Sequence, residues 1–406
     1  MKLLAMVIFA VFLGAVSLVV IINRASPTGP VTRLKLASTE LEVKVLLQNL
    51  EIPWDMSWSP DGWIWFSEKR GMISRYSPES GLLQRVHLIE DVFQSLDNSG
   101  LHALALHPDF PTVPFVYAHY THSPSESRLV RFRFNPSALI LEEPTTLLDG
   151  LHAALSHNGS RIVFSPDGSK LFLSLGEAFQ PEMAQDLNEY SGKILRMNLD
   201  GSVPADNPFP GSLVWSYGHR NPQGLVYASN GKLYSSEHGP ANNDELNVIE
   251  KGRNYGWPTV QGYCDYPEEK AFCAGHQVRE PLWIWSPTIA VSGIEFYDHE
   301  AIPEWRGSIL VTSLKRQSKE HYGQRLVQVR LDPEGEKVIE ANDYLVNAFG
   351  RLREVMSSPD GRVFIFTSNR ELNANRLTPE RPGDDKLIML RNPEFPVIHP
   401  TIHQQL

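Results

Sequence analysis

The sequence predicts an all-β protein, and within that class a six-bladed β-propeller. Three observations lead to this prediction. From about residue 41 onward, short apolar runs alternate with Gly, Pro, Asn and Asp, and no convincing amphipathic helix longer than a few turns interrupts them. A turn of the type Ser-Pro-Asp-Gly recurs, in which proline presets φ and glycine accepts a positive φ. The units also repeat at a regular spacing, as blades that pack against their neighbours do.

The recurring turn marks four of the predicted units. The turns read SPDG at 59–62, HPDF at 107–110, SPDG at 165–168 and SPDG at 358–361. An apolar run with strand character follows each of them. Two further units, which begin near Ala228 and Tyr297, keep the layout without the turn, so that six units are spaced by roughly 50–70 residues. A pair of β-sandwiches with coincidental turns is the alternative that this pattern leaves open.

The N-terminus predicts a membrane anchor. The segment from Leu3 to Ile22 is uncharged and has about the 20 residues that a helix needs to cross a bilayer. It is longer than the apolar part of a cleaved signal peptide, which has about 7–15 residues. We therefore expect an uncleaved inner-membrane anchor over residues 1–24 and an exported, periplasmic body, which would be secreted if the segment were cleaved. The remaining expected divisions are a linker at 25–40, the propeller at 41–395 and a tail at 396–406.

Charge and cysteine content exclude some classes of protein. The net charge is −10 and the isoelectric point is about 5.8, so there is no basic face for nucleic acid. The two cysteines, Cys264 and Cys273, cannot by themselves build a metal site of the Cys/His kind. In an exported protein they predict a disulfide across a short loop, and a pair of free thiols is the alternative.

Polar loops that precede strands contain the candidates for chemistry. His157 lies in such a loop, and an imidazole is well suited to taking a proton near neutral pH. In a propeller, these loops converge on one end of the central channel. Similar loops contain four cations and an amide: Arg220 with Asn221, Lys315, Arg351 and Arg353. One histidine and four cations around a channel indicate an anionic ligand with several carboxylates.

The segment EHGPANNDELN, residues 237–247, has a different character. The backbone carbonyls of Gly239 and Pro240 and the carboxylates of Asp244 and Glu245 are hard oxygen donors of the kind that calcium prefers. The spacing is not that of an EF-hand loop, and a polar hairpin turn without a metal is the alternative.

Taken in order, these motifs resemble the pyrroloquinoline-quinone-dependent glucose/sorbosone dehydrogenase family, and within it the aldose sugar dehydrogenase type. The resemblance runs from Ile52 to about Thr367, and its longest matching stretches include SHNGSRIVFSPDG, WSYGHRNPQG, SSEHGPANNDELN and GRLREVMSSPDG. The family fold is a six-bladed propeller, which agrees with the count of repeated units.

The resemblance implies roles for particular residues. His157 would be the general base that takes the proton of the sugar C1 hydroxyl, and Arg220 would polarise a quinone oxygen of the cofactor. Gly239 and Pro240 would hold a calcium ion through their carbonyls, and Glu245 and Tyr255 would ligate a second, structural calcium. An external electron acceptor would complete the cycle. The expected cofactor contacts are Asn98, Arg220, Asn221, Thr288, Lys315, Arg351 and Arg353.

Three positions depart from the family pattern. Ser156 stands where soluble glucose dehydrogenases have an aspartate before the base, so that a charge that could stabilise an imidazolium is missing. Asn98 replaces a longer glutamine, and His102 replaces a leucine. These departures motivate an alternative function, in which a propeller with weakened catalysis binds a sugar or a partner protein.

Overall fold

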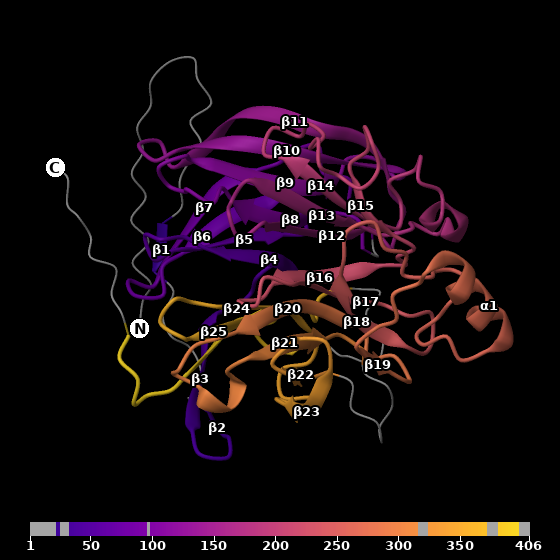
Figure 1. Ribbon diagram of the computed structural model, residues 1–406. Coiled ribbons are helices and arrows are strands. Elements are labelled where there is room, and N and C mark those ends of the chain that lie inside the picture. The colour runs from indigo at the N-terminus through magenta and orange to yellow at the C-terminus, as the bar shows by residue number, and fades with distance from the viewer. Residues whose placement is uncertain (1–21, 25–31, 96–97, 316–323, 372–380, 398–406) are drawn as a thin grey trace.

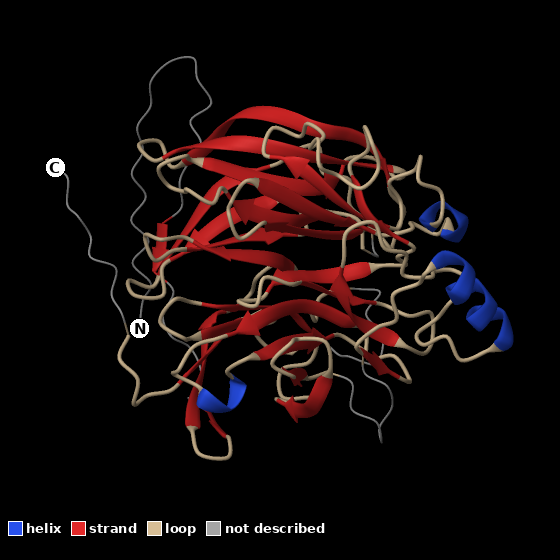
Figure 2. Cartoon of the chain, in the orientation of Figure 1, coloured by secondary structure: helices blue, strands red, loops and turns tan. Residues whose placement is uncertain are grey.

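The computed structural model describes residues 22–24, 32–95, 98–315, 324–371 and 381–397 (Figure 1). Antiparallel strands make up nearly all of its regular structure, and helices are confined to short connections (Figure 2). The strands form six sheets of four or five strands each, numbered here as blades 1–6.

The strands of blades 1–3 are the following. Blade 1 contains β1 (Ile22–Arg24), β4 (Pro53–Trp58), β5 (Ile64–Glu68), β6 (Met72–Tyr76) and β7 (Leu82–Leu88). Blade 2 contains β8 (Leu101–Leu106), β9 (Phe115–Thr121), β10 (Glu126–Asn135) and β11 (Ile140–His152). Blade 3 contains β12 (Gly159–Phe164), β13 (Lys170–Leu175), β14 (Lys193–Asn198) and β15 (Val214–Tyr217).

Blades 4–6 repeat the layout. Blade 4 contains β16 (Pro222–Tyr227), β17 (Leu233–Glu237), β18 (Asp244–Ile249) and β19 (Trp283–Trp285). Blade 5 contains β20 (Val291–Tyr297), β21 (Ser308–Ser313), β22 (Leu326–Leu331) and β23 (Val338–Tyr344). Blade 6 contains β2 (Thr32–Lys35), β3 (Glu40–Leu47), β24 (Leu352–Ser357), β25 (Val363–Thr367) and β26 (Leu387–Arg391).

The first strand of each repeated unit lies innermost. Each of these six strands, β4, β8, β12, β16, β20 and β24, contacts the next one, and β24 contacts β4, so that the ring is closed. Buried apolar clusters fill the spaces between adjacent blades, as expected where sheets pack face to face. The predicted six-bladed propeller is confirmed, and the pair of β-sandwiches is excluded.

Blade 6 combines strands from the N-terminal and the C-terminal parts of the propeller. Strand β3 pairs antiparallel with β26, with Val43 opposite Leu390, while β24 and β25 complete the inner part of the sheet. The segment predicted as a linker, residues 25–40, therefore differs from the expectation, because it contains β2 and the first residue of β3.

The recurring turns all connect an innermost strand to the second strand of its blade. In the three SPDG turns the glycine N–H donates to the serine carbonyl over 2.8–2.9 Å, at Gly62, Gly168 and Gly361. These turns therefore lie at one end of the ring. The starts of the innermost strands and the ends of the second strands lie at the opposite end, which is where the candidate site residues gather.

The predicted anchor falls almost entirely outside the described residues. Its last residues, Ile22–Arg24, form the short strand β1 beside β7 and do not continue a helix. In the part of the chain that the structure describes, no helix has the length and apolar character that a membrane crossing requires.

Helix α1 (Pro267–His276) projects from the end that carries the site (Figure 1). Cys264, just before the helix, forms a disulfide with Cys273 inside it, so the predicted pairing is confirmed. Glu269 accepts the backbone N–H groups of Asp265 and Tyr266 at 3.1 Å each and so caps the helix. Elsewhere in the described residues, the helices are the 3₁₀ turns η1 (Pro181–Ala184) and η2 (Pro303–Trp305).

Opening the Cys264–Cys273 disulfide is expected to lower the stability of the fold. A cross-link between residues nine apart in sequence restricts the unfolded chain by about 2–3 kcal/mol. Urea unfolding of the native chain and of a Cys264→Ser/Cys273→Ser variant, both without reductant, measures the difference. An equal free energy of unfolding for the two proteins would contradict the prediction.

Candidate active site

His157 lies between a carboxylate and a guanidinium, at the end of the propeller where the innermost strands begin. Its Nδ1 contacts Oε1 of Glu177, which follows the end of β13. Its Nε2 lies 3.3 Å from Nη2 of Arg220, which precedes β16. The His157 side chain is 16% exposed and that of Glu177 only 3%. The imidazole is therefore held from one side by a buried anion, while its other nitrogen faces the site.

Two glycines let the His157 loop lie close to β13. A Cβ on Gly176 would stand 1.9 Å from the His157 carbonyl oxygen, and one on Gly159 would stand 2.6 Å from the Gly176 nitrogen. The Ala178 N–H donates to the same His157 carbonyl at 3.0 Å. His157 itself has a positive φ of 61°, a conformation rare for a side-chain-bearing residue and common at functional sites.

Glu237, at the end of β17, organises the Arg220 loop. Its carboxylate accepts the backbone N–H of Arg220 and, at 2.9 Å, contacts Nδ1 of the fully buried His219. The Arg220 guanidinium donates to the His238 carbonyl at 3.2 Å and lies 5.2 Å from the centre of the Trp257 ring. Burial lowers the pKa of Arg220. Its Nε is buried and has no hydrogen-bond partner among the described residues, so the group can still donate to a ligand.

Asn221 joins this loop to its neighbours. Its Oδ1 accepts the Gly159 N–H at 3.0 Å and the Gln223 amide at 3.2 Å. Gln223 in turn accepts from Nη1 of Arg353 at 3.2 Å. This chain of contacts links the loop of the predicted base to the cations of blade 6.

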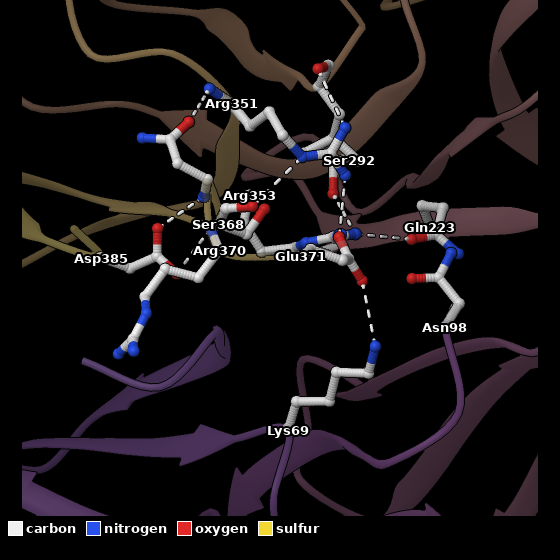
Figure 3. A network of polar contacts seen from close by, with 12 residues as sticks. Lys69, Asn98, Gln223, Ser292, Arg351, Arg353, Ser368, Arg370, Glu371 and Asp385 are labelled. Carbon is white, nitrogen blue, oxygen red and sulfur yellow. Dashed lines mark hydrogen bonds and ion pairs between the residues drawn. The ribbon is translucent and has the colours of Figure 1, made fainter. Parts of the chain in front are cut away.

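A buried ion network occupies the junction of blades 6 and 1 (Figure 3). Oε2 of Glu371 accepts from Nη2 of both Arg351, at 2.8 Å, and Arg353. Its Oε1 lies 3.6 Å from Nζ of Lys69. Burial alone would raise the pKa of Glu371, but Arg353, Lys69 and Arg351 lower it to about 2. The carboxylate is therefore charged and neutralises one of the three cations.

The two predicted arginines differ in their position within this network. Arg353 is fully buried, with its guanidinium 4.0 Å from the centre of the Trp54 ring. Arg351 is 8% exposed and donates to the carbonyls of Leu314, at 3.1 Å, and Ser368, at 3.2 Å. Arg353 thus lies behind the site surface, and Arg351 ties blade 6 to the loop that carries Lys315.

Lys315 and Thr288 lie together, as expected for two contacts to one ligand. Nζ of Lys315 donates to Oγ1 of Thr288 at 2.6 Å. The backbone N–H of Lys315 donates to the Ile289 carbonyl at 2.9 Å, which fixes the loop beside the start of β20.

One small pocket is lined by Arg220, Glu237 and the four residues to which the resemblance assigns calcium: Gly239, Pro240, Glu245 and Tyr255. The pKa of Glu245 is raised to about 8, mainly by burial and further by the nearby Glu237. Glu245 accepts from the Gly262 N–H at 2.9 Å and the Asn247 amide at 3.0 Å. Buried carboxylates that disfavour each other's charge are suited to a cation, which relieves the repulsion.

Only part of Tyr255 remains available to such an ion. Its hydroxyl donates to the Val248 carbonyl at 2.5 Å and accepts from the Glu250 N–H at 2.9 Å, so this oxygen is already engaged within the fold. Among the described residues, no three His, Cys, Asp or Glu side chains come together as a metal cluster.

Asn98 and His102, which both depart from the family pattern, contact each other. His102 is fully buried, its ring centre lies 4.4 Å from that of Trp54 with the planes inclined by 42°, and its Nε2 contacts the Asn98 carbonyl at 2.5 Å. Burial holds its pKa well below the ordinary value. Oδ1 of Asn98 is buried without a hydrogen-bond partner among the described residues, and it lies near the ion network (Figure 3).

Comparison with known proteins identifies the family of this chain. The family model described as Glucose / Sorbosone dehydrogenase matches residues 50–376, which is most of the propeller.

The chain belongs to the glucose/sorbosone dehydrogenase family.

Relatives and solved structures agree with this assignment. The chain is 32% identical to quinoprotein glucose dehydrogenase B of Acinetobacter calcoaceticus, over 91% of this chain and 96% of that one. It is 29% identical to the aldose sugar dehydrogenase YliI of Escherichia coli, over 84% and 94%. The PQQ-bound aldose sugar dehydrogenase of Streptomyces coelicolor superimposes with a TM-score of 0.74 at 32% identity, over 86% and 98%. The resemblance read from the motifs is confirmed, the chain is an enzyme of this family, and the binding-protein alternative is not favoured.

Sequence reasoning overlooked the buried acids of this glucose/sorbosone dehydrogenase. Glu177, Glu237 and Glu371 each follow or end the second strand of a blade, at the same end of the ring as His157. Their place at the end of an apolar run was a usable signal, because the second strands were predicted. The roles of the predicted residues toward cofactor, calcium and sugar stay predictions.

Proposed function

We propose that this glucose/sorbosone dehydrogenase oxidises the C1 hydroxyl of an aldose sugar with pyrroloquinoline quinone as cofactor, and that His157 is the general base. The observation that carries the proposal is the placement of His157 between Glu177 and Arg220 at the mouth of the ring. It supplies a base, an anion that orients it and a cation at the reacting position.

The two nitrogens of His157 have separate tasks. With a proton on Nδ1 donated to Glu177, the lone pair of Nε2 faces the site and can take the proton of a C1 hydroxyl. Glu177 fixes this tautomer and stabilises the imidazolium that forms. It thus supplies the charge that Ser156 cannot, from a different strand. Arg220 Nη2, 3.3 Å from Nε2, is placed to stabilise negative charge that develops next to the sugar oxygen.

The donor set fits a cofactor with several carboxylates. The unpaired Nε of Arg220 and the unpaired Oδ1 of Asn98 are polar atoms that a ligand can satisfy, and three cations surround the single carboxylate of Glu371. Arg220, Asn221 and Asn98 would hold one side of the cofactor, and Thr288, Lys315 and Arg351, backed by Arg353, would hold the other. When bound, the quinone supplies the acceptor for the hydride of C1.

Calcium is part of the proposal. The carbonyls of Gly239 and Pro240 would hold one ion beside Arg220, and Glu245 with the Tyr255 carbonyl would hold a second. The support is the pocket that all four residues share and the buried Glu245 carboxylate within it. Hard oxygen donors suit this ion, and a bound cation would favour the charged form of Glu245.

We also propose an extracytoplasmic location for the propeller. The Cys264–Cys273 disulfide supports it, since such bonds persist in oxidising compartments. Anchoring through residues 3–22, and an external acceptor that reoxidises the cofactor, belong to the same proposal.

The test uses the purified chain without cofactor. Pyrroloquinoline quinone and calcium are added separately and together, and dye reduction is followed with a panel of aldoses. We expect turnover that needs both additions and that a calcium chelator abolishes. Cofactor binding without oxidation of any aldose would refute the proposed reaction, and absence of cofactor binding would refute the assigned cofactor.

A further inference from the structure

Phe179 has a combination of properties that the fold does not require. Its side chain is 58% exposed, although it is a large apolar group. The centre of its ring lies 4.3 Å from that of His157, with the two planes inclined by 34°. One face of the phenyl group therefore covers the predicted base. The remainder is open to solvent at the end of the propeller that carries the site.

The backbone at this position is unfavourable for a side chain as large as phenylalanine. Ala178 and Phe179 have positive φ values of 50° and 62°, a region that bulky residues rarely adopt. Hydrogen bonds hold the turn: the Gln180 N–H donates to the Glu177 carbonyl at 2.8 Å, and the Ala178 N–H donates to the His157 carbonyl at 3.0 Å. A glycine would meet this geometry with less strain. Strained residues tend to gather at functional sites.

Packing does not explain the phenyl ring either. Of the buried apolar clusters formed by the described residues, none includes Phe179. A second exposed apolar side chain, Leu155, 48% exposed, lies two residues before His157. The neighbouring Gln180 is a polar group at the same rim, with its amide 2.8 Å from Nε2 of His152. Phe179 is therefore an exposed apolar group against the base, and its sequence neighbour Gln180 carries a hydrogen-bonding amide.

We infer that Phe179 binds the sugar substrate. Its phenyl group stacks against the C–H face of the sugar ring, and His157 deprotonates the C1 hydroxyl of the same sugar. This inference rests on the proposed function and names the substrate class within it. An aromatic face attracts the weakly positive C–H groups of a pyranose and excludes water from them. An aldose with equatorial hydroxyls presents a continuous C–H face, so this geometry favours such sugars over epimers with an axial hydroxyl on the stacked side.

Steady-state kinetics of Phe179→Ala test the inference. We expect KM for the preferred aldose to rise about fivefold to thirtyfold, the range that one or two kcal/mol produces, with kcat changed much less, because His157, Glu177 and Arg220 remain. Phe179→Tyr, which keeps the aromatic face, should restore a KM close to that of the native chain. Ile339→Ala removes an equally exposed apolar group (61%) on β23 and should leave KM unchanged.

A stability measurement separates binding from a structural role. Phe179→Gly relieves the positive φ, so we expect an unchanged or higher melting temperature together with the raised KM. A lowered melting temperature with unchanged KM would overturn the inference. An unchanged KM in Phe179→Ala, with cofactor binding and turnover intact, would overturn it while leaving the proposed function standing.

The inference can also be tested if the proposed reaction fails. Saturation-transfer NMR on the cofactor-free chain measures contact of an aldose with the protein directly. Transfer to the sugar ring protons that disappears in Phe179→Ala supports the stacking role. Equal transfer in the native chain and the variant, or none in either, contradicts it.

Discussion

Replacing His157 with alanine is expected to lower kcat of the fully loaded enzyme by about 10²–10⁴-fold, the usual contribution of a positioned general base. The change removes the group whose Nε2 faces the reacting position and leaves the ion network around Glu371 and the Lys315–Thr288 contact intact. We therefore expect cofactor affinity, followed by the change in cofactor absorbance on titration, to stay close to that of the native chain.

Two further variants sharpen this test. Glu177→Gln keeps the shape beside Nδ1 of His157 but removes the charge, so we expect a fall in kcat in the same direction and smaller than that of His157→Ala. His276→Ala removes an exposed histidine of α1 and should not change kcat. Full turnover in His157→Ala would assign the base to another residue.

Replacing Glu371 with glutamine is expected to destabilise the fold by about 3–5 kcal/mol, because it leaves buried cations without their anion. The Arg353 and Glu371 side chains are 0% and 2% exposed. The loss should appear in urea unfolding of the cofactor-free chain. The variant should also bind the cofactor more weakly, since Arg351 loses the contact that orients it. Glu334→Gln makes the same change at an exposed position and should alter stability by less than about 0.5 kcal/mol.

The effect of Glu371 should depend on pH in a defined direction. The pKa of Glu371 in the fold, about 2, lies below the ordinary value of 4.5. The carboxylate therefore stabilises the fold fully above pH 4.5, and this contribution is lost as the pH falls toward 2. The difference in unfolding free energy between the native chain and Glu371→Gln should be constant from pH 5 to 7 and shrink below pH 4.5. A difference that grows on acidification would contradict this account of the network.

The features that the sequence predicted correctly depend on local patterns. Pro-Asp-Gly turns reveal their conformation through proline and glycine, and they occur once in each of several repeated units, so both the blade count and the position of strands such as β5 and β25 could be inferred. The location of His157 and Arg220 followed in turn, because both lie just before an innermost strand, and those strand starts share one end of a propeller.

What the sequence could not predict depends on contacts between distant segments. In the sequence, nothing around Glu371 in the segment SNRE signals an ion network. Only folding brings Lys69 of blade 1 and Arg353 of blade 6 next to its carboxylate. Glu177 likewise gains its role only because β12 and β13 place it against His157. The pairing of β3 with β26 joins segments more than 300 residues apart, and neither strand carries a signal for the other. Helix α1 escaped prediction because its pattern is weakly amphipathic and its start, Pro267, follows a turn-rich stretch.

The shared sheet of blade 6 has a consequence for how the protein is made. Strand β3 leaves the ribosome long before β26, so the edge that pairs with β26 stays unpaired until that strand has been synthesised. Lys69 is likewise translated long before Arg351 and Glu371, so the ion network cannot form in a nascent chain. Pairing of blade 6 and formation of the ion network thus both depend on segments that are synthesised late. A polypeptide that ends before β26 therefore has an exposed edge on β3 that invites aggregation.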